Sequence, residues 1–148
     1  MHANSAASHA RDHIIAVAIT LLLPLSLHAQ SGKWVATIGQ LTNGGAADIS
    51  VDPRNDKQSK AKIILRNTKR DMRLAWDIVS GRCRDEGVAV APQAAFSQIQ
   101  TQMDGGGTAS SNVPKLESGK MYYVRVYDPQ INATDASAFG CANLSEKL

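Results

Sequence analysis

Apolar and polar side chains alternate most regularly in the stretch that leads to Cys83. One side of this stretch carries Met72, Leu74, Trp76 and Ile78, and the other carries Arg73, Ala75, Asp77 and Val79. A period of two predicts a β-strand, here with an apolar face that we expect to fill the core and with Gly81 as its end. Met121–Tyr127 has the same period, with Tyr122, Val124 and Val126 on one face.

Shorter strands are predicted on both sides of these two. Each is bounded by Gly, Pro, Asn or Asp, which favour turns. They cover Lys33–Ile38, Ala47–Val51, Lys62–Arg66, Gly87–Ala91, Thr108–Val113 and Ala138–Leu144. Arg54–Lys60 and Gln130–Ser137 are polar and are expected to be loops. About eight short strands predict an all-β fold, an antiparallel Greek-key-like β-sandwich or a related barrel.

Residues 94–103 allow two interpretations. Phe96 and Ile99 fit an apolar stripe at helical spacing, but Phe96, Gln98 and Gln100 also fit a strand. Because the neighbouring segments are strands, we expect a strand or an irregular segment. The run Gly105–Gly107 precedes neither a lysine nor a helix start, so a hairpin tip is expected there and not a phosphate loop.

The first 29 residues are predicted to be a signal peptide. A polar start with Arg11 precedes the apolar run Ile14–Leu27, and the small-residue pattern Leu27-His28-Ala29 follows. The run has about 14 residues, fewer than the roughly 20 of a membrane-spanning helix. An uncleaved membrane tether is the alternative. Cleavage leaves one domain, residues 30–148, that is periplasmic or secreted and has no membrane span.

Cleavage would also remove every histidine. His2, His9, His13 and His28 are the four histidines of the chain, and all lie in the predicted signal peptide. The remaining domain has no imidazole for a catalytic triad, for zinc or copper, or for proton transfer near neutral pH. The sequence therefore predicts a protein that is not an enzyme and has no metal or cofactor.

The charge of the chain is modest. Its 148 residues carry a formal net charge of +3, and only residues 56–62 and 66–70 are locally dense in basic side chains. Such a charge favours solubility and weak attraction to acidic surfaces. It does not predict dedicated nucleic-acid binding.

Both cysteines of the chain, Cys83 and Cys141, lie in the predicted domain. An even number in an exported chain predicts a disulfide. In the chain-entropy model, such a bond stabilises the fold by about 4 kcal/mol. The alternative is a reactive thiol or a thiolate metal site, but no histidine and no C-x-x-C motif accompany these cysteines.

Four stretches of the second half carry a family likeness. They are Trp76–Cys83, Gly105–Leu116, Gly119–Val126 and Phe139–Leu144. In their order they resemble short secreted β-sandwich domains related to copper/zinc superoxide dismutase, including CHRD-type domains. The resemblance implies the scaffold and a disulfide between Cys83 and Cys141. The metal histidines of short bacterial relatives, four and six residues before the cysteine, are replaced here by Val79 and Asp77. The resemblance thus implies the scaffold without its metal.

Two sets of oxygen-bearing side chains are candidates for acid–base catalysis or metal binding. Asp85 and Glu86 are adjacent carboxylates, but in a glycine-flanked charged turn we expect them to be solvated. Asp52, Asn55 and Asp56 offer oxygen ligands for calcium. Their spacing lacks the alternate ligands and the glycine of a calcium loop, so a polar turn is expected.

The best candidate for binding is one face of the strand Met121–Tyr127. Tyr123, Arg125 and Tyr127 share that face, and aromatic residues and arginine are enriched in interaction hot spots. The alternative is that the face is half-covered and that the arginine stacks on a tyrosine.

These observations predict an exported, non-catalytic β-sandwich that binds a protein or a small ligand. The motivation is the absence of histidine from the predicted domain. Two alternatives remain open. One is a metal-handling protein like superoxide dismutase, and the other is a purely structural component of the cell envelope.

Overall fold

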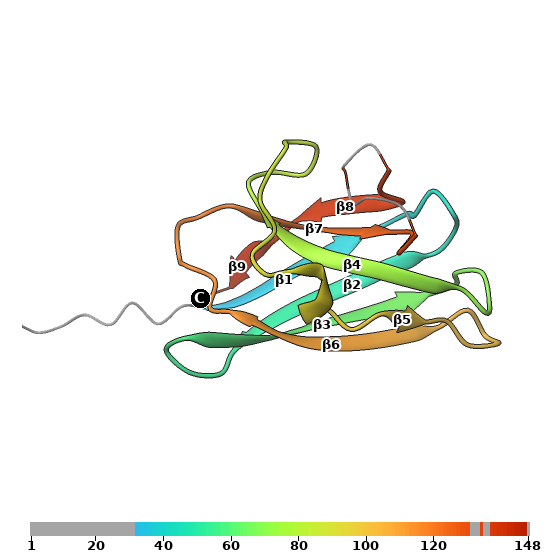
Figure 1. Cartoon of the computed structure of the whole chain (residues 1–148), viewed down its shortest axis with the longest axis horizontal. Coiled ribbons are helices and arrows are strands. Elements are labelled where there is room, and N and C mark those ends of the chain that lie inside the picture. Colours follow the sequence, from blue (N-terminus) through green and yellow to red (C-terminus); the bar gives the residue numbers. More distant parts are fainter. Residues whose placement is uncertain (1–31, 131–133, 135–136, 148) are drawn as a thin grey trace, which may run out of the picture.

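The computed structural model describes residues 32–130, 134 and 137–147 (Figure 1). These residues form nine strands and one short 3-10 helix, and the strands make two antiparallel sheets. The predicted all-β sandwich is therefore confirmed. The predicted signal peptide, residues 1–29, and the first residues of the predicted domain lie outside the described residues. In the part that the structure describes, no helix is long and apolar enough to cross a membrane.

The first sheet has five strands. They are β1 (Lys33–Ile38), β2 (Ala46–Pro53), β3 (Gln58–Arg66), β6 (Gly107–Pro114) and β9 (Ser145–Lys147). Their order across the sheet is β6-β3-β2-β1-β9. The first three strands follow one another as a meander, because the turns at Thr42–Gly45 and Pro53–Lys57 reverse the chain.

The second sheet has four strands. They are β4 (Arg73–Ser80), β5 (Ile99–Gln100), β7 (Tyr122–Tyr127) and β8 (Gly140–Asn143), in the order β5-β4-β7-β8. The 3-10 helix η1 (Gln93–Ala95) lies between β4 and β5 in the chain. β6 returns to lie beside β3, and β7 crosses back to lie beside β4. These neighbours, distant in sequence, give the sandwich its Greek-key-like connections (Figure 1).

The inward faces of the two sheets form one apolar core. β3 shows the cause, because its alternate residues Ser59, Ala61, Ile63 and Leu65 are buried. Leu74, Trp76 and Ile78 of β4 are fully buried, as predicted. The indole N–H of Trp76 donates to the backbone oxygen of Ser97 at 2.8 Å, and its ring meets that of Phe96 edge-on with centroids 5.2 Å apart.

The end of the chain closes one side of the sandwich. The predicted last strand, 138–144, is in fact β8, and at Leu144 the chain leaves the second sheet to become β9 beside β1. The N–H of Leu144 still bonds to Tyr122 at 2.8 Å, whereas Glu146 lies opposite Trp34 of β1. Gly140 lets β8 lie close to β1, because a Cβ at residue 140 would lie 2.8 Å from a side-chain carbon of Ile38.

Three other sequence boundaries need correction, whereas the expectation of a strand or an irregular segment for residues 94–103 is confirmed. β3 begins at Gln58, so it takes three residues from the expected loop Arg54–Lys60; small inward residues at 59 and 61 hide the alternation. The expected strand Gly87–Ala91 is reduced to one bridge, between Val79 and Ala89. Residues 94–103 hold the end of η1 and the two-residue β5. Gly105–Gly107 joins strands of different sheets and is no simple hairpin tip.

Candidate functional site

The outward face of the four-stranded sheet is buried along its two central strands, β4 and β7, like its inward face. Every residue from Leu74 to Val79 in β4 and from Tyr122 to Tyr127 in β7 is buried. Antiparallel sheets commonly leave their outward face in water. The polar side chains on this face are therefore enclosed, which makes it the first place to look for a site.

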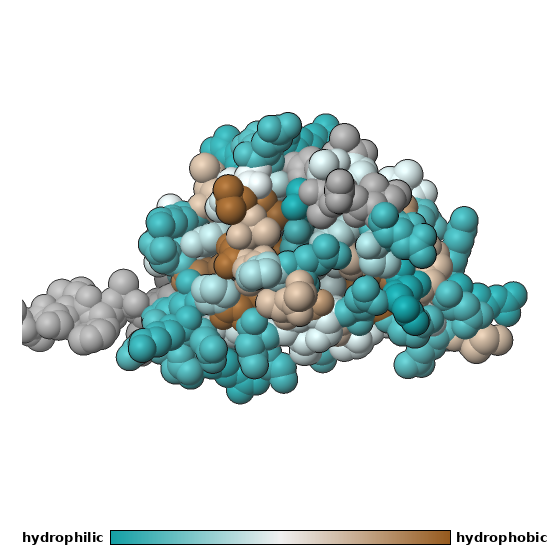
Figure 2. Space-filling view, viewed as in Figure 1, coloured by the Kyte–Doolittle hydropathy of each residue, from teal (hydrophilic) through white to brown (hydrophobic). Residues whose placement is uncertain are grey.

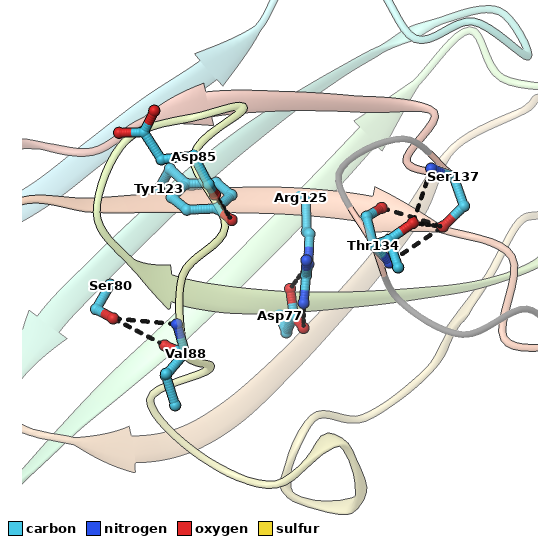
Figure 3. Close-up of polar contacts among 8 residues, drawn as sticks. All are labelled: Asp77, Ser80, Asp85, Val88, Tyr123, Arg125, Thr134 and Ser137. Carbon is cyan, nitrogen blue, oxygen red and sulfur yellow. Dashed lines mark hydrogen bonds and ion pairs between the residues drawn. The ribbon is translucent and has the colours of Figure 1, made fainter.

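An ion pair occupies the middle of that face. Asp77 of β4 and Arg125 of β7 lie directly opposite each other in the ladder. The guanidinium donates from Nε to Oδ1 at 2.8 Å and from Nη2 to Oδ2 at 3.0 Å, so the pair is bidentate (Figure 3). Asp77 is 3% exposed and Arg125 is 8% exposed. A buried pair with this geometry matches the two charges to each other, and removal of either partner takes this contact away from the other buried charge.

Tyr127 lies beside the ion pair. The guanidinium carbon of Arg125 is 5.9 Å from the centre of the Tyr127 ring, within the range of a cation–π contact. The hydroxyl of Tyr127 is buried and has no hydrogen-bond partner among the described residues. Burial, and secondarily the charge of Asp77, raises the pKa of Tyr127 to about 12, while Arg125 opposes the shift. The hydroxyl is therefore protonated at neutral pH and is no ready base.

The loop between β4 and η1 covers part of this face. The hydroxyl of Tyr123 donates to the backbone oxygen of Asp85 at 2.9 Å (Figure 3). Farther along the loop, the N–H of Ser80 donates to Val88 at 2.9 Å. Gly87 packs so tightly that a Cβ there would overlap the carbonyl oxygen of Ser80 and lie 2.7 Å from Val79. Only glycine fits this position without a shift of the loop.

A disulfide holds the start of the loop. Cys83 is bonded to Cys141 of β8, with Cα atoms 5.7 Å apart, so the predicted disulfide is confirmed. The N–H of Cys83 also donates to the side-chain oxygen of Asn143 at 2.8 Å. Gly81 and Arg84 turn the chain with φ angles of 108° and 79°. A disulfide in this place is compatible with an oxidising environment outside the cytoplasm.

The predicted acidic candidates do not converge on a site. Asp85 and Glu86 are exposed, and the hydrogen bonds of Asp85 run through its backbone: its N–H donates to the carbonyl of Arg82 and its carbonyl accepts from Tyr123. Asp52 lies 3.3 Å from the ammonium of Lys33. The side-chain oxygen of Asn55 accepts from the N–H groups of residues 57 and 58, both at 2.9 Å, which makes the expected polar turn. No group of three His, Cys, Asp or Glu that could hold a metal occurs within the described ranges.

The predicted binding residues are enclosed. Tyr123 and Tyr127 are 0% exposed and Arg125 is 8% exposed. The stacking of Arg125 on Tyr127 follows the alternative interpretation, and the loop after β4 covers Tyr123. Binding through these three residues stays a prediction, and it would require the covering segments to move.

The sequence interpretation missed the partner of Arg125. Asp77 was visible on the mixed face of its strand, but its partner depends on the register of β4 against β7. Two mid-strand charges of opposite sign, each flanked by apolar residues, are the signal that could have suggested the pair. Asp77 and Arg125 are the only charged residues that are buried in the described part of the chain.

Comparison with known proteins gives no match: no family model, no curated protein and no solved structure is similar to this chain.

Proposed function

We propose that this chain is an exported, non-catalytic β-sandwich protein that works by binding. The observation that carries the proposal is the bidentate contact of Asp77 with Arg125. It occupies the buried polar face where an enclosed reaction centre would lie, and it leaves that carboxylate oriented towards a permanent cation. The neighbouring Tyr127 is held in its protonated form by burial. Such groups stabilise a scaffold and do not transfer protons near neutral pH.

We propose that the protein acts in the periplasm or outside the cell. The disulfide and the signal-like residues 1–29 support the periplasm or the exterior of the cell as the location. We also propose kinship with the superoxide dismutase-like and CHRD-type domains. Two antiparallel sheets and a cysteine pair in the place that the resemblance implies support that kinship.

A turnover assay tests the proposal. Purified protein with an intact disulfide is tested for superoxide dismutation and for hydrolysis of ester, peptide and glycoside substrates. We expect no turnover above that of the folded Asp77→Asn variant, because Asp77 is held by Arg125. Turnover that the folded variant has lost would overturn the proposal.

Metal analysis separates the main alternative. Protein purified without added metal is measured for copper and zinc per chain. We expect substoichiometric amounts, since no cluster of metal-ligating side chains lies in the part of the chain that the structure describes. One tightly held ion per chain would favour the metal-handling function instead.

A further inference from the structure

Four lysines gather where β3 begins and β6 ends, and we call them the lysine surface: Lys57, Lys60, Lys62 and Lys115. They belong to strands and strand ends that lie side by side, because the N–H of Lys115 donates to the carbonyl of Lys57 at 2.9 Å. None of the four forms an ion pair with any residue that the structure describes. Figure 2 shows a hydrophilic region over the β2–β3 turn and the adjoining strand ends.

The carboxylates around the lysine surface are largely engaged elsewhere. Asp52 lies opposite Lys60 in the ladder, but its carboxylate contacts Lys33 at 3.3 Å. Glu117 contacts Lys120 at 2.8 Å. Asp56 is the remaining nearby carboxylate without an ion pair in the described part. The lysine surface thus keeps an excess of positive charge, which favours an acidic partner.

The spacing on β3 matches an extended chain. Lys60 and Lys62 are alternate residues on the outward face of one strand, so their Cα atoms are about 7 Å apart. They face Asn112 and Ser110 of β6, which supply amide and hydroxyl groups. A shallow pocket of about 220 Å³ lies here, lined by Lys60, Ser110, Ser111 and Asn112. Alternate acidic residues of an extended segment have the same Cα spacing as Lys60 and Lys62.

A second pocket adjoins the lysine surface where β3 begins and β6 ends. It has about 450 Å³ and is lined by Asp56, Lys57, Pro114, Lys115, Leu116, Glu117 and Ser118. Pro114 and Leu116 give it an apolar wall, and two lysines and two carboxylates balance its charge. Such a pocket suits one apolar side chain next to an acidic stretch.

From this juxtaposition we propose that the lysine surface binds an extended acidic segment of a partner protein, with an apolar residue beside its acidic residues. The inference rests on the proposed binding function. A protein segment fits better than a nucleic acid, because the outward-facing residues of β3 and β6 include no aromatic side chain on which bases could stack. Salt should weaken the interaction, because exposed charges carry it.

The test uses fluorescence anisotropy with a labelled peptide of alternating glutamate and serine that ends in leucine. A second peptide carries glutamine in place of glutamate. The double variant Lys60→Glu/Lys62→Glu reverses the charge at two positions of the lysine surface. Its matched control is Lys69→Glu/Arg70→Glu, which makes the same change in net charge at exposed positions beyond the other end of β3.

We expect the glutamate peptide to bind, and the Lys60→Glu/Lys62→Glu variant to bind it at least about tenfold more weakly. The control variant should keep most of the affinity, and the glutamine peptide should bind poorly. Equal losses in both variants, or equal binding of both peptides, would overturn the inference, as would binding of a sulfated polysaccharide without binding of the peptide. These outcomes are independent of the turnover assay, which tests the proposed function.

Discussion

At the scale of single residues, the ion pair on the enclosed face is the feature on which the proposed function rests. Asp77 and Arg125 are joined by two hydrogen bonds. The two residues lie directly opposite each other in the pairing of β4 with β7. Desolvation of two charges costs several kcal/mol, and their mutual contact offsets this cost only while both are present. The pair therefore specifies the register of β4 against β7 more than it adds to the total stability.

The first prediction concerns the removal of one partner. Arg125→Met should lower the free energy of unfolding by about 3–5 kcal/mol, because the carboxylate of Asp77 stays buried without its cation. The double variant Asp77→Leu/Arg125→Met should recover most of that loss. Urea denaturation of the wild type and the variants, including Asp77→Leu alone, measures the coupling between the two positions. Additive losses in the double variant would contradict the account of the pair.

A second prediction concerns the buried hydroxyl of Tyr127, which has no hydrogen-bond partner among the described residues. Its pKa is about 12 in the folded protein and about 10 in the unfolded chain, so the folded state holds its proton more tightly. The stabilisation is complete below pH 10 and is lost as pH rises towards 12, at about 1.4 kcal/mol per pH unit. Tyr127→Phe should remove this loss of stability. Near neutral pH the substitution should be neutral or slightly stabilising, because no described residue forms a hydrogen bond with the hydroxyl.

The measurement for Tyr127 is urea denaturation of the wild type and of Tyr127→Phe at neutral pH and at about pH 11. The difference between the two proteins isolates Tyr127 from the other tyrosines and the lysines. Parallel losses of stability in both would show that Tyr127 titrates normally in the folded protein.

At the scale of elements, the loop after β4 is held at three places. The disulfide fixes Cys83 to β8, Tyr123 bonds to Asp85, and the close contact of Gly87 with Ser80 fixes its return along β4. These contacts come from three different strands. The loop thus connects β4, β7 and β8, and it covers Tyr123.

The third prediction is for the disulfide. Reduction, or the double variant Cys83→Ser/Cys141→Ser, should lower the free energy of unfolding by about 4 kcal/mol, because the bond closes a long loop of the unfolded chain. Hydrogen exchange should become faster in residues 81–92 before it does so in the core strands. A variant as stable as the wild type would show that the bond does not constrain this fold.

The elements show what the sequence could and could not predict. Strict alternation identified β4 and β7 almost to the residue, because an apolar inward face leaves a clear period of two. β9 was missed because three polar residues at a chain end carry no such pattern. The burial of Tyr123 could not be predicted from the alternation of residues either, because it depends on how far the loop after β4 folds back over the sheet.

At the scale of the whole molecule, the outward faces of the two sheets differ in how much of their surface is exposed. The four-stranded sheet is covered on its outward face, whereas the five-stranded sheet exposes alternate side chains of β3. The basic stretch 56–62 was visible in the sequence as locally dense charge. Only the pairing of β3 with β6 shows that Lys57 and Lys115 meet there without carboxylate partners in the described residues.

Binding of the glutamate–serine peptide by two variants tests the central claim most directly. One variant, Asp77→Leu/Arg125→Met, replaces the buried ion pair with apolar side chains. The other, Lys60→Glu/Lys62→Glu, reverses two charges of the lysine surface. The account predicts that the first keeps the affinity of the wild type and that the second loses it by about tenfold. Retained binding in the lysine variant, together with loss in the folded pair variant, would place the function on the enclosed face and contradict the account.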